Sequence, residues 1–378
     1  MSSPLLDLGR DLRDTSAGTS TRIPVLIGME GSGRTAALLA LRSELGPDAA
    51  QYVNFERSAT TPERFLGALT RHSPFVRRVE PTGPASTPRA AFDEALQFLC
   101  TATTVTGAPA VFLVDEALEV RTFENFPGLR TVVKDTLHAF GESPNRFVLT
   151  SRYSQRARRL LRDLSERYEL VEASPLSTED VAHELSEGAF EGAATDVARA
   201  IHAFTSGRPA YVRALTSKLL QVTRQGGKDT VAALAEQLMP GGALNASCQF
   251  SYEVRLQRAR GYGALKAILD VLADEEPLTL TEIAIRLHRT PGSTKDYLSW
   301  LEDVDLIAST RKKYRFADPL LRLWVRLHCR PDPPTEDEVT EEVRRYAVGC
   351  LQLAGADRAG VVRPAVERLR PSGIIEID

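Results

Sequence analysis

The segment Gly28–Thr35, Gly-Met-Glu-Gly-Ser-Gly-Arg-Thr, has the spacing of a phosphate-binding loop. The general pattern is Gly-x-x-x-x-Gly-Lys-Ser/Thr between a strand and a helix, and one position differs here because Arg34 replaces the lysine. Glycines allow successive backbone N–H groups to curl around phosphate oxygens, and the N-terminus of the following helix adds its positive dipole end. A structural glycine-rich turn is the alternative interpretation.

This loop predicts a set of nucleotide contacts. The hydroxyl of Thr35 is expected to bind Mg²⁺. Arg34 keeps the charge of lysine on a longer, planar head group, so we expect nucleotide binding to survive and hydrolysis to slow strongly. The residues expected to contact the nucleotide are Gly28, Glu30, Gly31, Ser32, Gly33, Arg34, Thr35 and Ala36.

Two further segments carry ionic side chains suited to the same phosphates. An apolar run ends in Asp115 and Glu116. Asp115 is predicted to hold the metal and Glu116 to act as general base for the attacking water, with a solvated pair at a strand end as the alternative. Arg152 follows the apolar run 146–150 and is predicted to contact the γ-phosphate as a sensor. Alternatively, Arg152 belongs to a solvated basic helix, because further arginines follow it closely.

The elements that must position these residues alternate along the chain. Such alternation requires crossover connections and predicts a parallel sheet covered on both faces. Pro81–Pro88 is predicted to be a loop. We predict strands at 23–27, 51–55, 110–116, 146–150 and 168–171, and helices at 35–41, 62–72, 90–102 and 129–140.

The remainder of the chain is predicted to be helical up to Met239, where Pro240-Gly241-Gly242 interrupts the pattern. Helices at 261–273, 278–284 and 293–301, followed by strands at 306–310 and 313–317, have the order of a winged helix-turn-helix. Basic and hydroxyl side chains suit contacts with DNA phosphates, acidic ones repel DNA, and a protein-contact role is the alternative. The favourable residues are Ser293, Thr294, Lys295, Arg311, Lys312, Lys313 and Arg315, and the unfavourable ones are Asp296, Glu302 and Asp303.

Composition limits the function classes. The 378 residues are 43% hydrophobic and 26% charged, with a net charge of −3. This charge argues against a surface that coats nucleic acid throughout, and leaves room for a local basic patch. No apolar run approaches the roughly 20 residues that cross a bilayer. The four cysteines are widely spaced, so we expect reduced thiols in a cytoplasmic protein with no membrane partner.

Together these segments resemble a STAND-type P-loop ATPase of the archaeal-type ATPase family, within the AAA-like group. This resemblance implies ATP and Mg²⁺ as cofactors and places Pro209 against the adenine; the choice of adenine over guanine rests on it alone. Two departures are Arg34 and the segment Leu8–Asp11, which lies closer to the loop than the corresponding family motif. The resemblance covers about 23–330 and rests on Gly28–Thr35, Asp115-Glu116, Thr150–Arg152, Gly207–Pro209 and Phe316–Trp324.

The predicted architecture is α/β, a parallel-sheet P-loop NTPase core followed by a helical lid domain and a winged helix-turn-helix domain. We predict an ATP-binding switch with weak or absent hydrolysis, which couples nucleotide state to a winged-helix output on duplex DNA, a protein partner or a homo-oligomer. The alternatives are an active ATP-hydrolysing motor and a nucleotide-free interaction scaffold with a vestigial P-loop. The predicted boundaries are 1–20 for a flexible N-terminus, 21–175 for the core, 176–240 for the lid, 241–330 for the winged helix and 331–378 for an acidic linker and helical tail.

Overall fold

The computed structural model describes residues 22–78, 87–188, 190, 194–223, 229–259 and 261–358. The predicted flexible N-terminus, the Leu8–Asp11 segment, most of the predicted 81–88 loop and the end of the tail lie outside these residues. The chain divides into two compact units, one formed by 1–175 with 249–319 and the other by 176–248 with 320–378. These units are discontinuous in sequence, whereas the predicted domain boundaries follow the chain in order and stay a prediction.

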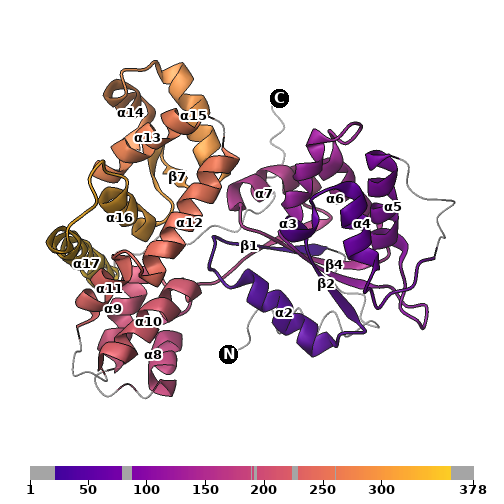
Figure 1. Cartoon of the computed structure of the whole chain (residues 1–378), viewed down its shortest axis with the longest axis horizontal. Helices are drawn as coiled ribbons and strands as arrows, with labels where there is room; N and C mark the ends of the chain where they lie inside the picture. Colours follow the sequence, from indigo (N-terminus) through magenta and orange to yellow (C-terminus); the bar gives the residue numbers. More distant parts are fainter. Residues whose placement is uncertain are drawn as a thin grey trace, which may run out of the picture. The chain divides into compact units, whose positions relative to one another are not determined.

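Five parallel strands form the central sheet of the first unit (Figure 1). The strand order is β2-β3-β4-β1-β5, so β4 lies between the strand that precedes the glycine-rich loop and the strand that ends in the carboxylates. All carboxyl ends lie at one edge of a parallel sheet, which confirms the predicted α/β core and brings the candidate residues to that edge. The strands are β1 (Ile23–Ile27), β2 (Ala50–Asn54), β3 (Val111–Asp115), β4 (Arg146–Ser151) and β5 (Tyr168–Glu172).

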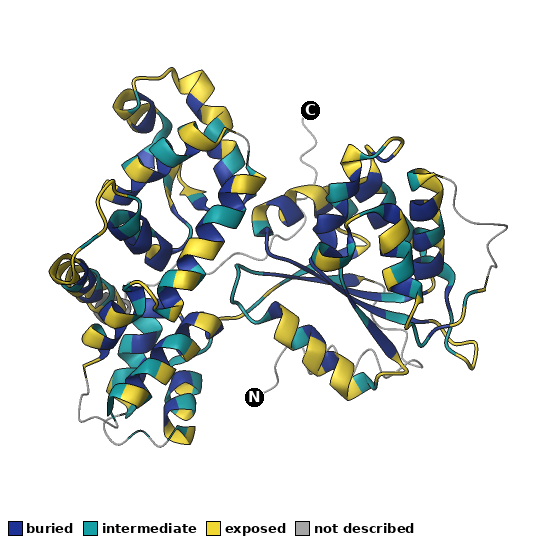
Figure 2. Ribbon diagram, in the orientation of Figure 1, coloured by how far each residue is buried: buried dark blue, intermediate teal, exposed yellow. Residues whose placement is uncertain are grey.

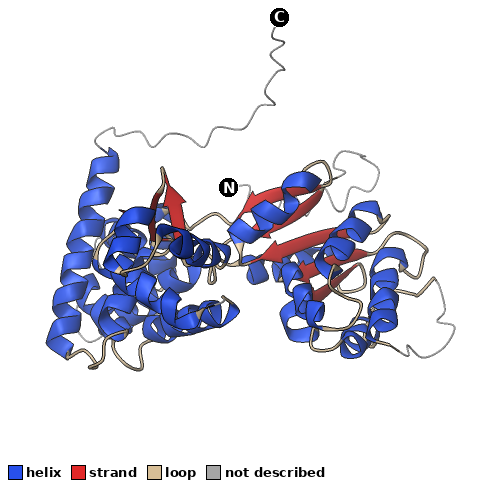
Figure 3. Ribbon diagram, turned by 90° about the horizontal axis from the view of Figure 1, so that it is seen from above, coloured by secondary structure: helices blue, strands red, loops and turns tan. Residues whose placement is uncertain are grey.

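Helices cover both faces of this sheet (Figure 1, Figure 3). On one face, Leu38 and Leu41 of the helix that follows the loop pack with Leu113 and Val148. On the other, a larger cluster includes Phe112 and its neighbours, because successive strand residues point to opposite faces. The strands β1, β3 and β4 are accordingly mostly buried, whereas the edge strand β5 is mostly intermediate or exposed (Figure 2). These helices are α2 (Arg34–Leu45), α3 (Phe55–Ser58), α4 (Pro62–Thr70), α5 (Pro88–Thr101), η1 (Ala117–Asn125), α6 (Val132–Glu142), α7 (Ser154–Leu161) and η2 (Arg162–Leu164).

The N-termini of these helices differ in a way that bears on ligand binding. Thr61 and Thr87 cap α4 and α5 with their hydroxyls, and each is followed by a proline at the first helical position. By contrast, α2 begins after Gly33 and has no side-chain cap. Its first backbone N–H groups therefore lack the side-chain acceptor that α4 and α5 have.

The second segment of the first unit has the element order predicted for residues 261–317. Its three strands form an antiparallel sheet in the order β6-β8-β7, in which β6 is a short strand that the sequence pattern did not predict. Thr279 caps α14 in a reciprocal capping box with Glu282. The elements are α12 (Ala243–Arg258), α13 (Tyr262–Asp274), β6 (Leu278–Thr279), α14 (Leu280–Arg286), α15 (Pro291–Asp303), β7 (Ile307–Thr310) and β8 (Lys313–Phe316).

The buried residue Asp305 connects this segment to the part of the first unit that contains the parallel sheet. The carboxylate of Asp305 accepts the backbone N–H groups of Ser154 and Gln155, which are the first two residues of α7. Asp305 has a left-handed φ of 52°, and its carbonyl accepts a 2.8 Å hydrogen bond from Arg255. Burial raises the pKa of Asp305 while the two N–H groups act to lower it. The helix that follows Arg152 is thus capped by a residue that lies 150 positions after Gln155 in the sequence.

The second unit contains helices from both of its chain segments. A helical pattern up to Met239 was predicted, and the break at Pro240–Gly242 separates α11 from α12. The predicted tail includes a longer helix than expected, α17, of 23 residues. No helix in the described ranges is both long and apolar enough to span a membrane. The helices are α8 (Thr178–Glu187), α9 (Ala194–Thr205), α10 (Pro209–Thr223), α11 (Thr230–Leu238), α16 (Pro319–His328) and α17 (Glu336–Arg358).

Candidate nucleotide-binding site

The glycine-rich loop connects the end of β1 to the start of α2, as predicted. Gly31 and Gly33 have φ values of 78° and 89°, which residues with a side chain rarely adopt. Gly28 is required for a different reason, because a Cβ there would lie 2.7 Å from the Ser32 hydroxyl and 3.0 Å from the Ala173 side chain. The loop backbone can therefore curl closely only with these glycines, which is the geometry that phosphate binding by backbone N–H groups demands.

Arg34 extends from the first residue of α2 to the carboxylate of Glu116. Its Nη1 lies 2.9 Å from Glu116 Oε1, and its Nε donates to the Ser32 hydroxyl at 3.3 Å. Only 7% of Arg34 is exposed. The guanidinium at the lysine position of the loop is thus held in a buried ion pair with the candidate general base.

The carboxylate of Asp115 accepts hydrogen bonds from four side chains. Thr150 donates to Oδ1 at 2.6 Å, and Thr35 donates to Oδ2 at 2.8 Å. Tyr52 and Asn54 also donate to Oδ2, at 2.8 and 3.1 Å. The two predicted metal ligands, Thr35 and Asp115, are therefore in direct contact at the edge of the sheet.

These oxygen atoms fit a magnesium ion. Mg²⁺ takes oxygen ligands and is commonly held by one or two protein groups together with substrate phosphates and water. A hydroxyl next to a carboxylate at the start of α2 provides such a pair. The described residues contain no cluster of three or more His, Cys, Asp or Glu side chains that could form an all-protein metal cage.

Glu116 is fixed by its backbone and by both of its carboxylate oxygens. It adopts a left-handed φ of 53°, and its N–H donates to the Thr150 hydroxyl at 2.9 Å. Oε1 faces Arg34 and also lies 3.3 Å from Arg152 Nε, while Oε2 accepts the Arg152 backbone N–H at 3.0 Å. Only 4% of Glu116 is exposed. Its carboxylate thus accepts hydrogen bonds from one guanidinium and one amide, and forms an ion pair with a second guanidinium.

Arg152 lies where the sequence predicts a sensor, directly after β4. Its guanidinium is paired with Glu116 and also with Glu56. Burial acts to lower the pKa of Arg152, but these two carboxylates outweigh it and raise the pKa. The alternative of a solvated basic helix does not describe this residue, since only 8% of it is exposed. The role of Arg152 at a γ-phosphate stays a prediction.

Sequence reasoning missed three residues of this site, Tyr52, Asn54 and Glu56. Tyr52 and Asn54 occupy alternate positions of β2, and Asn54 is paired in register with Asp115. Burial and the neighbouring Asp115 raise the pKa of Tyr52 to about 12, although Asn54 acts to lower it. Two polar side chains on one face at the end of a predicted strand were the available signal, because the carboxyl ends of parallel strands meet.

Two further residues predicted to contact the nucleotide are Glu30 and Pro209. One carboxylate oxygen of Glu30 is buried and accepts no hydrogen bond within the described chain, so the loop contains an unsatisfied acceptor. Pro209 begins α10 in the second unit, after Gly207 with its φ of 66°. A Cβ on Gly207 would lie 2.4 Å from the Leu176 carbonyl, which gives this turn a structural reason. The contact of Pro209 with adenine stays a prediction.

Comparisons with known proteins identify the fold. No family model and no curated protein match the sequence. A Walker-type ATPase of Pyrococcus abyssi has a similar structure, with 16% sequence identity, a TM-score of 0.59 and coverage of 85% of this chain and 95% of that one. The Orc1 protein of Aeropyrum pernix in complex with DNA matches with 16% identity, a TM-score of 0.45 and 93% coverage of each chain. The likeness to the Pyrococcus abyssi structure shows that the chain has the P-loop NTPase fold.

Proposed function

We propose that this protein binds ATP with Mg²⁺ and acts as a switch whose hydrolysis is weak or absent. The backbone of the glycine-rich loop would hold the phosphates, and Thr35 with Asp115 would hold the metal. Bound Mg²⁺ would neutralise charge on the phosphate oxygens. ATP rather than GTP is proposed from the resemblance of the sequence to AAA-like ATPases of the STAND type.

The ion pair between Arg34 and Glu116 carries the proposal of weak hydrolysis. A general base must have a free lone pair within hydrogen-bond reach of the attacking water. Here both carboxylate oxygens of Glu116 are engaged, and Arg34 is one of the engaging groups. The same contact draws the positive charge of Arg34 away from the position that the P-loop lysine uses at the β- and γ-phosphates. Arginine in place of lysine at position 34 thus weakens both the general base Glu116 and the positive charge at the β- and γ-phosphates.

A continuous set of ion pairs supports a coupling of this site to the segment from α12 to β8, residues 243–316, which is called the winged-helix segment below. Arg152 pairs with Glu56, and Arg258 of α12 lies 3.6 Å from the other Glu56 oxygen. Arg258 also pairs with Glu119. Glu119 lies on η1, and η1 begins directly after Glu116. A ligand that displaces Arg34 or Arg152 from Glu116 would alter this set. A switch of this kind requires a ligand with different affinities for the two arrangements.

The first expected result concerns Mg²⁺-dependent binding. Wild-type protein should bind ATP, and Thr35→Ala should weaken binding of Mg-ATP about tenfold, equivalent to roughly 1.4 kcal/mol. The reason is loss of the metal-binding hydroxyl. Isothermal titration calorimetry with ATP, with and without Mg²⁺, measures this effect, and GTP titrated in parallel tests the choice of base.

A matched control is Thr70→Ala, which removes a hydroxyl whose one hydrogen bond among the described residues is to the Leu66 carbonyl of its own helix. This variant should bind Mg-ATP like the wild type. Absence of ATP binding by the wild-type protein would favour the scaffold alternative. Rapid turnover stimulated by DNA or by a protein would favour the motor alternative.

DNA is proposed as a target of the winged-helix segment because of its basic wing. The two residues between β7 and β8, Arg311 and Lys312, have φ values of 53° and 64°. Hairpin turns of this type favour Asn-Gly, so two exposed basic residues here indicate a functional requirement. Thr294, predicted to suit phosphate contacts, is instead fully buried and donates to the Thr290 carbonyl. Asp303, predicted to repel DNA, is already paired with Arg159.

We expect Lys312→Ala/Lys313→Ala to weaken duplex DNA binding and to reduce the slope of log affinity against log salt by about 2, because each lysine at a phosphate contributes about 1. Fluorescence anisotropy of labelled duplex at several salt concentrations gives this slope. Lys134→Ala, which removes an exposed lysine of α6, is the control and should leave it unchanged. Equal slopes for the wild type, the double variant and the Lys134→Ala control would exclude the wing as the DNA contact and favour protein docking.

A further inference from the structure

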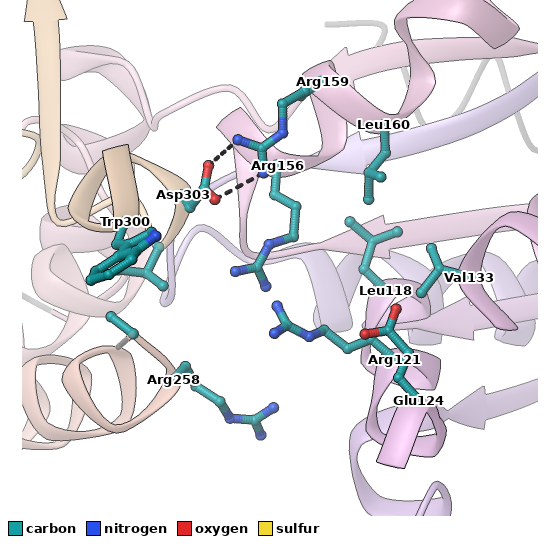
Figure 4. Close-up of a pocket in the computed structure, with 12 residues that line it drawn as sticks. Leu118, Arg121, Glu124, Val133, Arg156, Arg159, Leu160, Arg258, Trp300 and Asp303 are labelled. Carbon is teal, nitrogen blue, oxygen red and sulfur yellow. Dashed lines mark hydrogen bonds and ion pairs between the residues drawn. The ribbon is translucent and has the colours of Figure 1, made fainter. Parts of the chain in front are cut away.

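The first unit contains a polar cavity whose lining does not include the glycine-rich loop. It has a volume of about 300 Å³ and is lined by η1 and α7 on one side and by α12 and α15 on the other. The lining includes the four arginines Arg121, Arg156, Arg159 and Arg258. Figure 4 shows the guanidinium groups of Arg121 and Arg156 pointing toward each other in this cavity.

The four arginines differ in their partners. Arg159 pairs with Asp303, and Arg258 pairs with Glu119 and Glu56. Within the described chain, Arg121 and Arg156 have neither an ion pair nor a side-chain hydrogen bond; Arg156 only lies over the Tyr153 ring, 4.9 Å from its centre. The other carboxylate in the lining, Glu124, also forms no ion pair among the described residues.

Of the four arginines of the cavity, Arg156 is the one whose surroundings call for a negatively charged ligand. It is 9% exposed, so its charge is largely removed from water, and it has a second positive charge beside it. Burial and the neighbouring Arg121 lower the pKa of Arg156, whereas Asp303 acts to raise it. A buried charge normally has a counter-ion. Two adjacent guanidinium groups that share no counter-ion among the described residues therefore form a site for an external anion.

We propose that this cavity is a second anion site, in which Arg121 and Arg156 bind the phosphate group of a small phosphate-bearing ligand. A guanidinium fork matches phosphate oxygens in pairs, and a phosphate monoester brings a charge of about −1.5 to −2 at neutral pH. The cavity volume is at the small end for ligand sites, which excludes a large ligand. The indole of Trp300 lines the cavity and provides an aromatic face for a planar group attached to the phosphate.

This location connects the second site to the first. The element η1 begins directly after Glu116, and α7 begins two residues after Arg152. A phosphate held between Arg121 of η1 and Arg156 of α7 would therefore fix the two elements that leave the candidate catalytic residues. The anion site itself rests on the cavity and does not require that the glycine-rich loop binds ATP.

The test uses the full-length protein and the fluorescence of Trp300, with inorganic phosphate and adenosine monophosphate as separate probes at matched ionic strength. We expect a saturable change with wild type, and an affinity at least about tenfold weaker in Arg121→Gln/Arg156→Gln, which loses both forks. Loss of the signal in Trp300→Phe assigns it to this residue rather than to Trp324. Tighter binding of the nucleotide than of phosphate would identify a phosphate ester as the ligand, and equal binding would identify free phosphate.

Two controls separate this site from the loop. Arg130→Gln removes an exposed arginine outside the cavity, and Gly33→Val disables the loop because valine does not adopt a φ of 89°; both should keep the Trp300 response. Thermal unfolding checks that the double variant is folded, and Arg156→Lys, which keeps the charge without the fork, should bind with intermediate affinity. The proposal is wrong if wild type shows no saturable response up to about 10 mM of either probe. It is also wrong if the double variant binds like wild type, or if duplex DNA alone produces the response.

Discussion

Arg34→Lys should hydrolyse ATP about 10²-fold faster than the wild-type protein, which is the lower end of what a general base contributes. The shorter reach and compact charge of lysine disfavour the 2.9 Å contact with Glu116 and return a point charge to the P-loop position. Glu116 Oε1 then loses one of its two guanidinium partners. The gain is limited because Arg152 still contacts this carboxylate. Phosphate release under saturating Mg-ATP measures kcat directly.

A second substitution in the same background distinguishes the two causes of the gain. If lysine acts by freeing the general base, Arg34→Lys/Glu116→Gln should return to the wild-type rate. Glu116→Gln alone should change the already slow wild-type rate little. A gain that persists in the double variant would show that lysine acts only at the phosphates. An Arg34→Lys variant as slow as wild type would contradict the role assigned to the ion pair.

Much of the site could be predicted because strand ends and loops have strong local signals. The apolar runs before Gly28, Asp115 and Arg152 identify three strands, and parallel strands bring their carboxyl ends to one edge. Thr35 and Asp115 were therefore expected near each other, and the structure places them in hydrogen-bond contact. What the pattern leaves open is strand order, because β4 lies between β1 and β3 although it follows both in sequence.

Contacts made by long side chains could not be predicted from the pattern. The charge of Arg34 was expected at the phosphates, yet its long side chain reaches Glu116, which follows β3, two positions away from β1 in the sheet. Sequence spacing does not decide between two acceptors within reach of one guanidinium. Similarly, Asp305 caps α7 from about 150 residues away, and a helix cap supplied by a distant segment has no local signature.

Two of the four donors to Asp115, Tyr52 and Asn54, depend on the register of β2 with β3. A shift of one residue between β2 and β3 would move Tyr52 and Asn54 to the opposite face of the sheet. The sequence predicts both strands but not their pairing, so only the observed register of Asn54 with Asp115 reveals the four-donor arrangement. This arrangement shows that Asp115 is both a candidate metal ligand and a structural acceptor.

The removal of one charge at Asp115 should therefore have two separable effects. In Asp115→Asn, we expect the affinity for Mg-ATP to fall about 10²-fold, because charge-assisted contacts are roughly twice as strong as neutral ones and a hard cation prefers an ionised carboxylate. We expect the free energy of unfolding to fall by only about 1 kcal/mol, because the amide oxygen can still accept from Thr35, Tyr52 and Asn54. Calorimetric titration with Mg-ATP and urea unfolding measure the two quantities, and Asp48→Asn, at an exposed carboxylate, is the control for charge.

The pH dependence of the same variant tests whether Asp115 also determines the state of Tyr52. In the wild type the pKa of Tyr52 is raised to about 12, first by burial and then by Asp115. A raised pKa means that Tyr52 contributes stability that is present below its ordinary value near 10 and is lost as pH rises toward 12. In Asp115→Asn the neutral amide no longer disfavours the phenolate, so the pKa of Tyr52 should fall and this loss of stability should begin at lower pH. Difference absorbance of tyrosinate follows that single group when the wild type is compared with Tyr52→Phe, and Asp115→Asn with Asp115→Asn/Tyr52→Phe. An unchanged titration would show that burial alone sets the pKa, and that the four-donor arrangement at Asp115 matters for the metal and not for the neighbouring strand.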